Sequence, residues 1–315
     1  MNSFALGVPL VPFIRLLPAE YDDNESLPRG GLTSSSLPSP RKVSEVVHQV
    51  IEKNKSETNF SLMVMQFGQF LDHDLTLTPE QERDCSNPDV LSRDQDEDAA
   101  LRVCFNIDVD ENDIFYANRI QSLPLTRSDG ICHENVREQF NALTAFIDGS
   151  QIYGSDDAVS KQLRTLENGL LKVHRLGPTL PTRSQTGLLD EHLSPEDLVA
   201  GDIRAIEQPG LASLHSLFVN EHNRIAKEIQ ESNEGLNDEE VFQEARRYVI
   251  AELQNIVYNE FLPTVLGGSL IHNYKLKLEN DETTFYNDTV NPSISNEFAT
   301  FAFRFGHTLI PNFFR

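Results

Sequence analysis

Apolar side chains recur at helical spacing along much of the chain, and this pattern predicts a mainly α-helical protein. The clearest case is 238–260, where apolar positions fall every three or four residues and Asn237 with Glu240 predicts a capped start. Further helices are expected over 57–75, 157–166 and 210–231, and a last one contains His307 and stops at Pro311. Strand signals are sparse.

Long irregular stretches separate these helices. A Gly/Ser/Pro loop at 29–42 leads into a short helix, and 85–135 is rich in loops. In 167–200 the apolar residues show no clear helical or strand periodicity. The sequence shows no internal repeat and no marked domain boundary. We therefore expect one mainly α domain with long irregular loops over residues 1–315.

Composition narrows the classes of partner. The chain has 315 residues, enough for a sizeable core, and a formal net charge of −23, which argues against nucleic acid or anionic membranes as partners. No apolar run reaches the roughly 18 residues that span a bilayer. The first residues carry Pro9, Pro12 and Arg15 without a basic leading segment, so no signal peptide is recognised.

Residues 66–74, QFGQFLDHD, place several polar side chains inside an otherwise apolar segment. On a helix, Gln69, Asp72 and His73 share one face, and Asp74 points about 100° further round. Buried polar groups are costly unless each has a partner, so the cluster indicates a site. From these residues alone, an amphipathic helix with a satisfied histidine stays open as the alternative.

Five blocks of sequence, in order, resemble the animal haem peroxidase superfamily. They are LLPAEYDDNESLPRG (16–30), MVMQFGQFLDHDLTLTPE (63–80), NALTAFIDGSQIYGS (141–155), AGDIRAIEQPGLASLHSLF with EHNRIAKEI (200–218 and 221–229), and FAFRFGHTLI (301–310). The resemblance runs from about residue 7 to the last residue and implies the helical peroxidase fold. Because the family's domain continues further, we expect this domain to be incomplete at its C-terminus.

The resemblance implies a haem site. His73 matches the distal base, Arg204 the distal arginine, and Gln69 the glutamine that orders ligands in the cavity. A peroxidase needs a neutral base to move a proton between the peroxide oxygens, and a fixed positive charge to stabilise the departing oxygen. His307 matches the axial iron ligand, and Arg304 a partner of a haem propionate.

Two carboxylates match those that become ester-linked to haem methyl groups in this superfamily, namely Asp72 and Glu207. Some members carry a methionine after the glutamate, which forms a third, sulfonium link to the haem. Here that position is Gln208. Since a sulfonium raises the oxidising power of the haem, chloride is not expected as a donor, whereas phenols, tyrosine, iodide, bromide and thiocyanate are.

The resemblance also implies a calcium site. Asp74 matches one ligand, and the loop that starts at Thr144 supplies the others, which are Thr144, Phe146, Asp148 and Ser150. Hydroxyl, carbonyl and carboxylate oxygens are hard ligands that suit Ca²⁺. For the loop alone, an Asx turn without an ion is the alternative. The spacing of His215, Glu221 and His222 does not converge on one point, so we interpret them as structural.

The cysteines and sequons bear on localisation. Cys85 and Cys104 match positions that pair in the family, and Cys132 is either free or bonded to another molecule. N-x-S/T sequons start at Asn24, Asn54, Asn59 and Asn287, which fits secretion. On family grounds we expect an extracellular protein.

Two functions follow. The first is a haem- and calcium-dependent peroxidase that reduces hydrogen peroxide and oxidises small electron donors, with extracellular matrix proteins as candidate partners. The second is a non-catalytic fragment or an adhesion protein of the same fold. The intact set of site residues favours the first, and the expected missing region favours the second.

Overall fold

The computed structural model describes residues 6–30, 37–47, 60–82, 85, 103–116, 119–133, 135–188, 194–277 and 287–311. The chain divides into two compact units. Unit 1 comprises Met1–Val11, Thr58–Leu77 and Ala142–Arg315, and unit 2 comprises Pro12–Glu57 and Thr78–Asn141. The expectation of a single domain over 1–315 stays a prediction.

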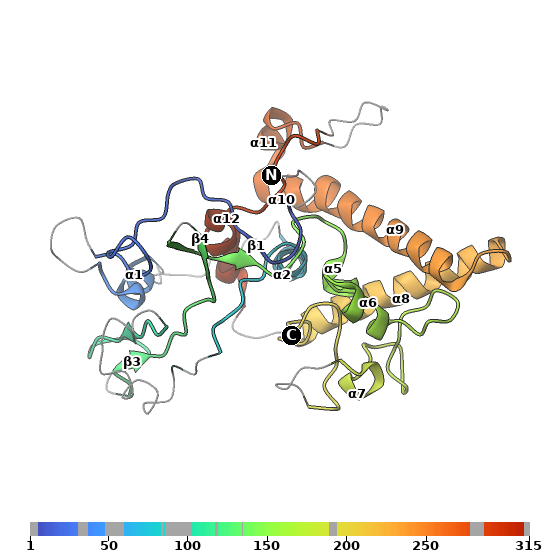
Figure 1. Cartoon of the computed structure of the whole chain (residues 1–315), viewed down its shortest axis with the longest axis horizontal. Coiled ribbons are helices and arrows are strands. Elements are labelled where there is room, and N and C mark those ends of the chain that lie inside the picture. Colours follow the sequence, from blue (N-terminus) through green and yellow to red (C-terminus); the bar gives the residue numbers. More distant parts are fainter. Residues whose placement is uncertain are drawn as a thin grey trace. The chain divides into compact units, whose positions relative to one another are not determined.

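Unit 1 is built from helices (Figure 1). Its α-helices are α2 (Met63–Leu75), α5 (Ser150–Tyr153), α6 (Asp157–Leu163), α7 (Arg183–Thr186), α8 (Pro209–Ser232), α9 (Asp238–Ile256), α10 (Leu262–Leu266), α11 (Gly268–Asn273) and α12 (Asn296–Thr300). A π-helical segment, η2 (Val257–Phe261), follows α9, and a 3-10 segment, η3 (Ala302–Leu309), follows α12. The expected mainly helical fold is confirmed.

The long helices α8 and α9 form a hairpin, and both match their predicted ranges closely. Pro209 occupies the first turn of α8, where a missing N–H costs nothing, and the Gln208 side chain accepts a hydrogen bond from the backbone of Gly210. Asn237 and Glu240 form the predicted capping box at the start of α9. Local sequence signals therefore determine where both helices begin.

The core of unit 1 packs α2 against α8, with α9 alongside. The Phe70 ring, fully buried in α2, stacks on Phe218 of α8 with 5.1 Å between centroids. His222 of α8 is fully buried, and its Nδ1 lies 2.9 Å from the Tyr153 hydroxyl while its Nε2 lies 2.9 Å from the carbonyl of Gly169. This pairing fits the structural interpretation of His222.

Four helices differ in detail from the prediction. The helix expected over 57–75 begins at Met63, although residues 57–59 lie outside the described part, and α6 ends at Leu163. At the end of α9, the π-helical turn brings Phe261 against Phe67 of α2, with 5.6 Å between ring centroids. The expected last helix is split at Phe301, whose backbone leaves the helical region (φ −133°, ψ −64°), and continues as the 3-10 segment η3.

Unit 2 contains one described α-helix, α1 (Pro40–Val47), and short strands. They are β2 (Ile107–Asp108), β3 (Ser122–Leu123), β4 (Ile131–His133), β5 (Val136–Glu138) and β6 (Phe140–Asn141), with β1 (Val11–Pro12) where the two units meet in sequence. β2 pairs with β3 and β4 with β5, both antiparallel. The salt bridge from Arg41 of α1 to the buried Asp113 fastens the helix to this unit.

The cysteines of unit 2 behave as the family resemblance implies. Cys85 and Cys104 form a disulfide, as expected. Cys132 is exposed and forms no disulfide within the part of the chain that the structure describes. Its predicted alternatives, a free thiol or an intermolecular bond, both stay open.

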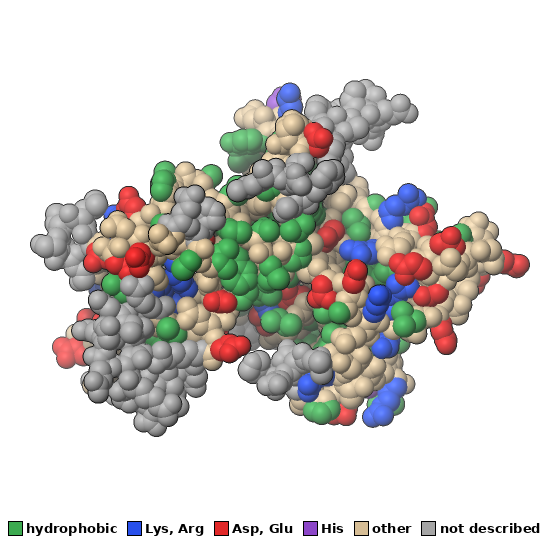
Figure 2. All heavy atoms as spheres, in the orientation of Figure 1, with side chains coloured by type: hydrophobic (Ala, Val, Ile, Leu, Met, Phe, Trp, Pro, Cys, Tyr) green, Lys and Arg blue, Asp and Glu red, His purple; other side chains and the backbone are tan. Residues whose placement is uncertain are grey.

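Charged side chains cover the α8–α9 hairpin, with acidic and basic groups interleaved (Figure 2). Arg224 pairs with Glu221 and Glu228, and Arg247 pairs with Glu244. Such exposed pairs contribute little stability, because water and salt screen their charges. Across the described residues, no helix is long and apolar enough to cross a membrane.

Candidate functional site

Helix α2 buries His73, which is only 3% exposed. Among the described residues, its Nδ1 has no hydrogen-bond partner. Two carboxylates approach the ring: Asp202 Oδ1 lies 3.8 Å from Nδ1, and Glu207 Oε2 lies 3.9 Å from Nε2. Burial, followed by the positive charge of Arg204, lowers the pKa of His73 to about 3. The imidazole is therefore neutral at neutral pH and able to accept a proton.

His73 faces a cavity of about 270 Å³ within unit 1. The lining includes all the residues that the sequence predicts for a haem site, which are Gln69, Asp72, His73, Arg204, Glu207, Arg304 and His307. Apolar side chains, among them Phe261, Phe303 and Phe305, form much of the remaining wall. The structure thus brings together side chains that are up to about 240 positions apart in sequence.

Asp72 is the anion of an ion-pair cluster at this cavity. Its Oδ2 lies 2.6 Å from Arg304 Nη1 and 3.9 Å from Arg204 Nη1, and its Oδ1 accepts a hydrogen bond from Thr76 at 2.7 Å. Arg304 also donates from Nε to the carbonyl of Ala299 at 2.8 Å. One carboxylate therefore holds the start of η3 against α2.

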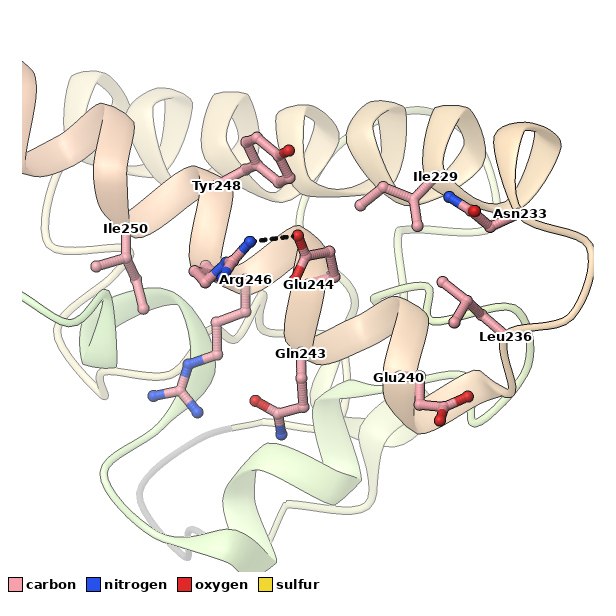
Figure 3. A pocket seen from close by; sticks show the side chains of 10 residues that line it. Ile229, Asn233, Leu236, Glu240, Gln243, Glu244, Arg246, Tyr248 and Ile250 are labelled. Carbon is pink, nitrogen blue, oxygen red and sulfur yellow. Dashed lines mark hydrogen bonds and ion pairs between the residues drawn. The ribbon is translucent and has the colours of Figure 1, made fainter.

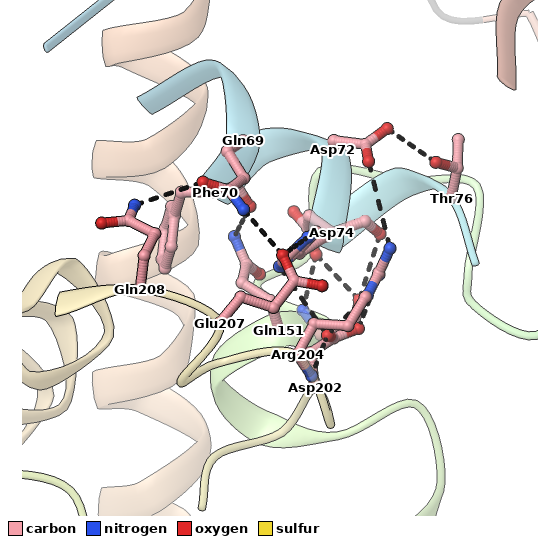
Figure 4. Close-up of polar contacts among 12 residues, drawn as sticks. Gln69, Phe70, Asp72, Asp74, Thr76, Gln151, Asp202, Arg204, Glu207 and Gln208 are labelled. Carbon is pink, nitrogen blue, oxygen red and sulfur yellow. Dashed lines mark hydrogen bonds and ion pairs between the residues drawn. The ribbon is translucent and has the colours of Figure 1, made fainter. Parts of the chain in front are cut away.

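The amides and Glu207 form a second cluster at the cavity (Figure 4). Gln69 Nε2 donates to Glu207 Oε2 at 2.8 Å, and Gln208 Nε2 donates to Gln69 Oε1 at 3.2 Å. Gln208 also hydrogen-bonds Gln66. The Glu207 side chain is 48% exposed, so this end of the cluster is open to solvent. Sequence reasoning missed the role of Gln208 as a link between these two segments.

Asp202 is the main site residue that the sequence analysis did not identify. It is buried, and its carboxylate binds the Arg204 guanidinium with Nε and Nη2 at 2.8 and 2.7 Å (Figure 4). The available signal was an acidic residue two positions before a predicted catalytic arginine. In a single sequence that spacing is too common to interpret.

The η3 segment carries His307, which lines the same cavity as the α2 residues. His307 lines the cavity but is exposed, and none of the residues of this described segment is buried. Phe305 and Leu309 of the same segment are also exposed, at 38% and 39%. The wall of the cavity formed by η3 is therefore exposed, whereas the wall formed by α2 is packed into the core.

The loop predicted for calcium brings two carboxylates together. Asp74 Oδ1 accepts hydrogen bonds from the backbone N–H and the hydroxyl of Ser150, at 2.7 and 2.8 Å. Asp148 Oδ1 accepts from the Ser150 N–H at 3.1 Å and from the Thr144 hydroxyl at 3.0 Å. Burial, and then the charge of Asp148, raises the pKa of Asp74 to about 7. Phe146 is 48% exposed, and its predicted contribution is the backbone carbonyl.

Among the described residues, no cationic side chain is hydrogen-bonded to either carboxylate at this loop, although the positive charge of Arg246 acts on Asp148. Within the described residues, no group of three or more His, Cys, Asp or Glu side chains is arranged to hold a metal ion. The predicted set instead combines two carboxylates with hydroxyl and carbonyl oxygens. Calcium therefore stays a prediction for this loop.

A wider hollow of about 880 Å³ lies beside α9 (Figure 3). Its lining contains Glu244 and Arg247, which pair with each other at 2.6 Å, together with apolar side chains such as Ile229 and Leu236. No histidine is among the described residues that line this hollow, and two of its charged side chains, Glu244 and Arg247, are paired with each other. The smaller cavity at His73 is therefore the candidate functional site.

Comparisons with known proteins match this chain over nearly its whole length. The family model described as animal haem peroxidase matches residues 2–315. Mouse myeloperoxidase is 38% identical over 334 residues, which cover 99% of this chain and 45% of that protein. The peroxidasin homolog pxn-2 of Caenorhabditis elegans is 35% identical over 339 residues, covering 96% of this chain and 25% of that protein. The chain thus spans less than half the length of these two relatives.

A solved structure extends the likeness to the fold. Peroxidase A from Dictyostelium discoideum aligns with a TM-score of 0.74 and 27% identity, over 96% of this chain and 56% of that one. A fatty acid alpha-dioxygenase from Oryza sativa aligns with a TM-score of 0.66 at 19% identity, a likeness of fold alone.

Proposed function

Because the chain belongs to the animal haem peroxidase family, we propose that it forms the haem site of a peroxidase that reduces hydrogen peroxide and oxidises small donors. The observation that carries the proposal is the convergence of His73, Arg204 and His307 on one cavity. Two histidines from separate segments, with an arginine beside one of them, are the groups that this chemistry needs.

The residues at the cavity fit a haem. His73 lines the cavity, and its Nε2 lies 3.9 Å from Glu207 Oε2, beyond hydrogen-bonding distance, which leaves this nitrogen available to a ligand in the cavity. The aromatic walls at Phe261 and Phe303 suit the apolar face of a porphyrin, and Arg304 suits a propionate. In this proposal His307 would bind the haem iron.

Haem would supply an iron that binds the peroxide and stores its oxidising equivalents. The chain's residues would manage the protons and the charge. Neutral His73 would accept the proton of the inner peroxide oxygen and deliver it to the outer one. Arg204 would stabilise the negative charge on the departing oxygen, and Gln69 would orient the peroxide by hydrogen bonding.

On family grounds, we propose that Asp72 and Glu207, which both line the cavity, form ester links to haem methyl groups. In the structure Asp72 holds Arg304 at 2.6 Å, so Arg304 is engaged. In the proposed link, a carboxylate oxygen of Asp72 would bond to a haem methyl carbon, which breaks a C–H bond and is a two-electron oxidation, with hydrogen peroxide, the proposed substrate, as the oxidant. The ester would carry no charge and would release Arg304 to pair with a haem propionate. Glu207, which also lines the cavity, would form the second ester.

The identity of residue 208 guides the choice of donor. Gln208 is part of the amide cluster with Gln66 and Gln69, and it cannot form a sulfonium link. Without that electron-withdrawing link, we propose phenols, tyrosine, iodide, bromide or thiocyanate as donors, and not chloride.

An extracellular location fits the surface features. The Cys85–Cys104 disulfide is typical of oxidising compartments. The two described sequon asparagines, Asn24 and Asn287, are both exposed. We propose secretion on these grounds, with extracellular matrix proteins as candidate partners.

Replacing the axial histidine should weaken haem binding. We expect His307→Ala to raise the Kd for haemin by about tenfold or more. The porphyrin would keep only its contacts with the apolar walls and the pairing of its propionate with Arg304. The measurement is a titration of the Soret band. His272→Ala, which removes an exposed histidine of α11, is the matched control and should bind like the wild type. Equal affinity of all three proteins would contradict the axial assignment.

Calcium should stabilise the fold through Asp74 and Asp148. Saturating Ca²⁺ should raise the thermal midpoint by about 5 °C or more, because the ion neutralises two close carboxylates. Asp74→Asn should lose most of this increment. Asp197→Asn, which alters a carboxylate bound to the Ser194 N–H in another loop, should retain it. A midpoint indifferent to EDTA in the wild type would rule out the calcium proposal.

A further inference from the structure

Asp202 occupies a buried position beside the catalytic candidates, and it is 2% exposed. Its Oδ1 accepts the backbone N–H of Arg204 at 2.9 Å and the side-chain Nε–H at 2.8 Å, while Oδ2 accepts Nη2–H at 2.7 Å. Its own backbone N–H donates to the carbonyl of Gln151 in α5 at 3.1 Å. A two-point carboxylate–guanidinium contact is thus anchored to a buried helix (Figure 4).

Asp72 is the other carboxylate near Arg204, but its interaction with Arg204 is weaker. Asp72 Oδ2 lies 3.9 Å from Arg204 Nη1, beyond hydrogen-bonding distance. Asp72 already accepts hydrogen bonds from Arg304 and Thr76, at 2.6 and 2.7 Å. The direction of the Arg204 side chain is therefore decided by Asp202.

The charge state of Asp202 suits this role. Burial alone would raise its pKa, but the hydrogen bonds and positive charge of Arg204 lower it below its usual value. The carboxylate stays ionised and compensates a guanidinium whose side chain is itself only 17% exposed. A buried arginine without such a partner would turn toward another anion or toward solvent.

We propose that Asp202 is the positioning residue that aims Arg204 into the cavity, holding Nε and Nη2 so that Nη1 stays free to donate to a bound ligand. Nη1 is the terminal nitrogen nearer Asp72, another residue of the lining. The catalytic consequence rests on the proposed peroxidase function, whereas the positioning does not.

The proposed haem links increase the need for Asp202. Esterified Asp72 and Glu207 would no longer be anions, so two of the carboxylates at the cavity would lose their charge. Asp202 would then be the carboxylate that still neutralises Arg204. A free carboxylate that remains ionised beside the arginine keeps it from binding a haem propionate in place of the peroxide.

The positioning can be tested without haem. In the wild-type chain, the Arg204 Nε–H signal in a ¹H–¹⁵N spectrum, identified by its loss in Arg204→Lys, should be protected from solvent exchange. Asp202→Asn should speed its exchange by about tenfold or more, and Asp202→Glu should restore part of the protection. The control is Asp238→Asn in α9, where the wild-type carboxylate Oδ2 lies 2.7 Å from Arg164 Nη2. This variant should leave the exchange of the Arg204 Nε–H unchanged. Unaltered protection in Asp202→Asn would overturn the proposal.

The catalytic consequence needs the haem-loaded chain. Asp202→Asn should slow the reaction with peroxide on the order of 100-fold while the Soret band stays as in the wild type. In an Arg204→Gln background the same change should add less than about twofold, because Asp202 acts through Arg204. If Asp202→Asn does not fold, Asp202→Glu is used instead. Partial loss of both the Nε–H protection and the peroxide reaction rate supports the proposal. Wild-type protection and a wild-type rate overturn it. Failure of every variant to bind haem would count against the proposed function and leave the exchange result to decide the positioning.

Discussion

Replacing His73 with glutamine should slow the reaction of the haem-loaded chain with hydrogen peroxide by about 1,000-fold. Glutamine fills a similar volume and keeps a polar end, but it cannot accept a proton and return it. No other described histidine except His307 lines the cavity, and that one is the proposed axial ligand. The rate is measured by mixing with peroxide in a stopped-flow spectrometer.

The same variant should still bind haem, because His307 is intact. His272→Gln, which changes an exposed histidine of α11, should react at the wild-type rate. A rate for His73→Gln within about tenfold of the wild type would mean that another group moves the proton.

Gly201→Ala should destabilise unit 1 by about 3 kcal/mol or more. A Cβ at this position would lie 2.7 Å from the backbone carbon of Ile152 and closer still to backbone atoms of Ser150 and Gly154. These are main-chain atoms of and beside α5, so they cannot move aside as a flexible side chain can. Urea unfolding followed by circular dichroism measures the loss.

The consequence of Gly201→Ala should reach the site. Gly201 precedes Asp202, whose backbone N–H is bonded to α5, so separating the two segments displaces the Arg204 anchor. The matched control is Gly235→Ala, where a Cβ meets no atom within 4 Å, and its stability should change by less than about 0.5 kcal/mol. Equal stability of the two variants would show that the close approach at Gly201 relaxes freely.

Much of the helical framework of unit 1 could be predicted from spacing and caps. The ranges of α8 and α9 followed from apolar periodicity and from Asn237 with Glu240, which are local signals. The π-helical turn before Phe261 could not be predicted, because it depends on the packing of Phe261 against Phe67 in another helix. The break at Phe301 could not be predicted either, because no glycine or proline stands at this position to indicate the end of a helix.

The candidate site, too, was predicted only in part from the sequence. Family motifs indicated His73, Arg204 and His307, and the structure places all three at one cavity, although their roles stay predictions. Asp202 was missed because its role arises from tertiary contacts, with Arg204 on one side and α5 on the other. The ion pair between Asp72 and Arg304 also could not be predicted from the sequence, because 232 positions separate the two residues.

The measurement that tests the central claim most directly is the absorption spectrum of the haem- and Ca²⁺-loaded chain during sequential mixing. One equivalent of hydrogen peroxide should shift the Soret band in a single step, and a following excess of tyrosine or another phenol should return it to the starting position. A spectrum that peroxide leaves unchanged, or that only bleaches as free haemin does, would contradict the account. The chain would then be a non-catalytic member of its family.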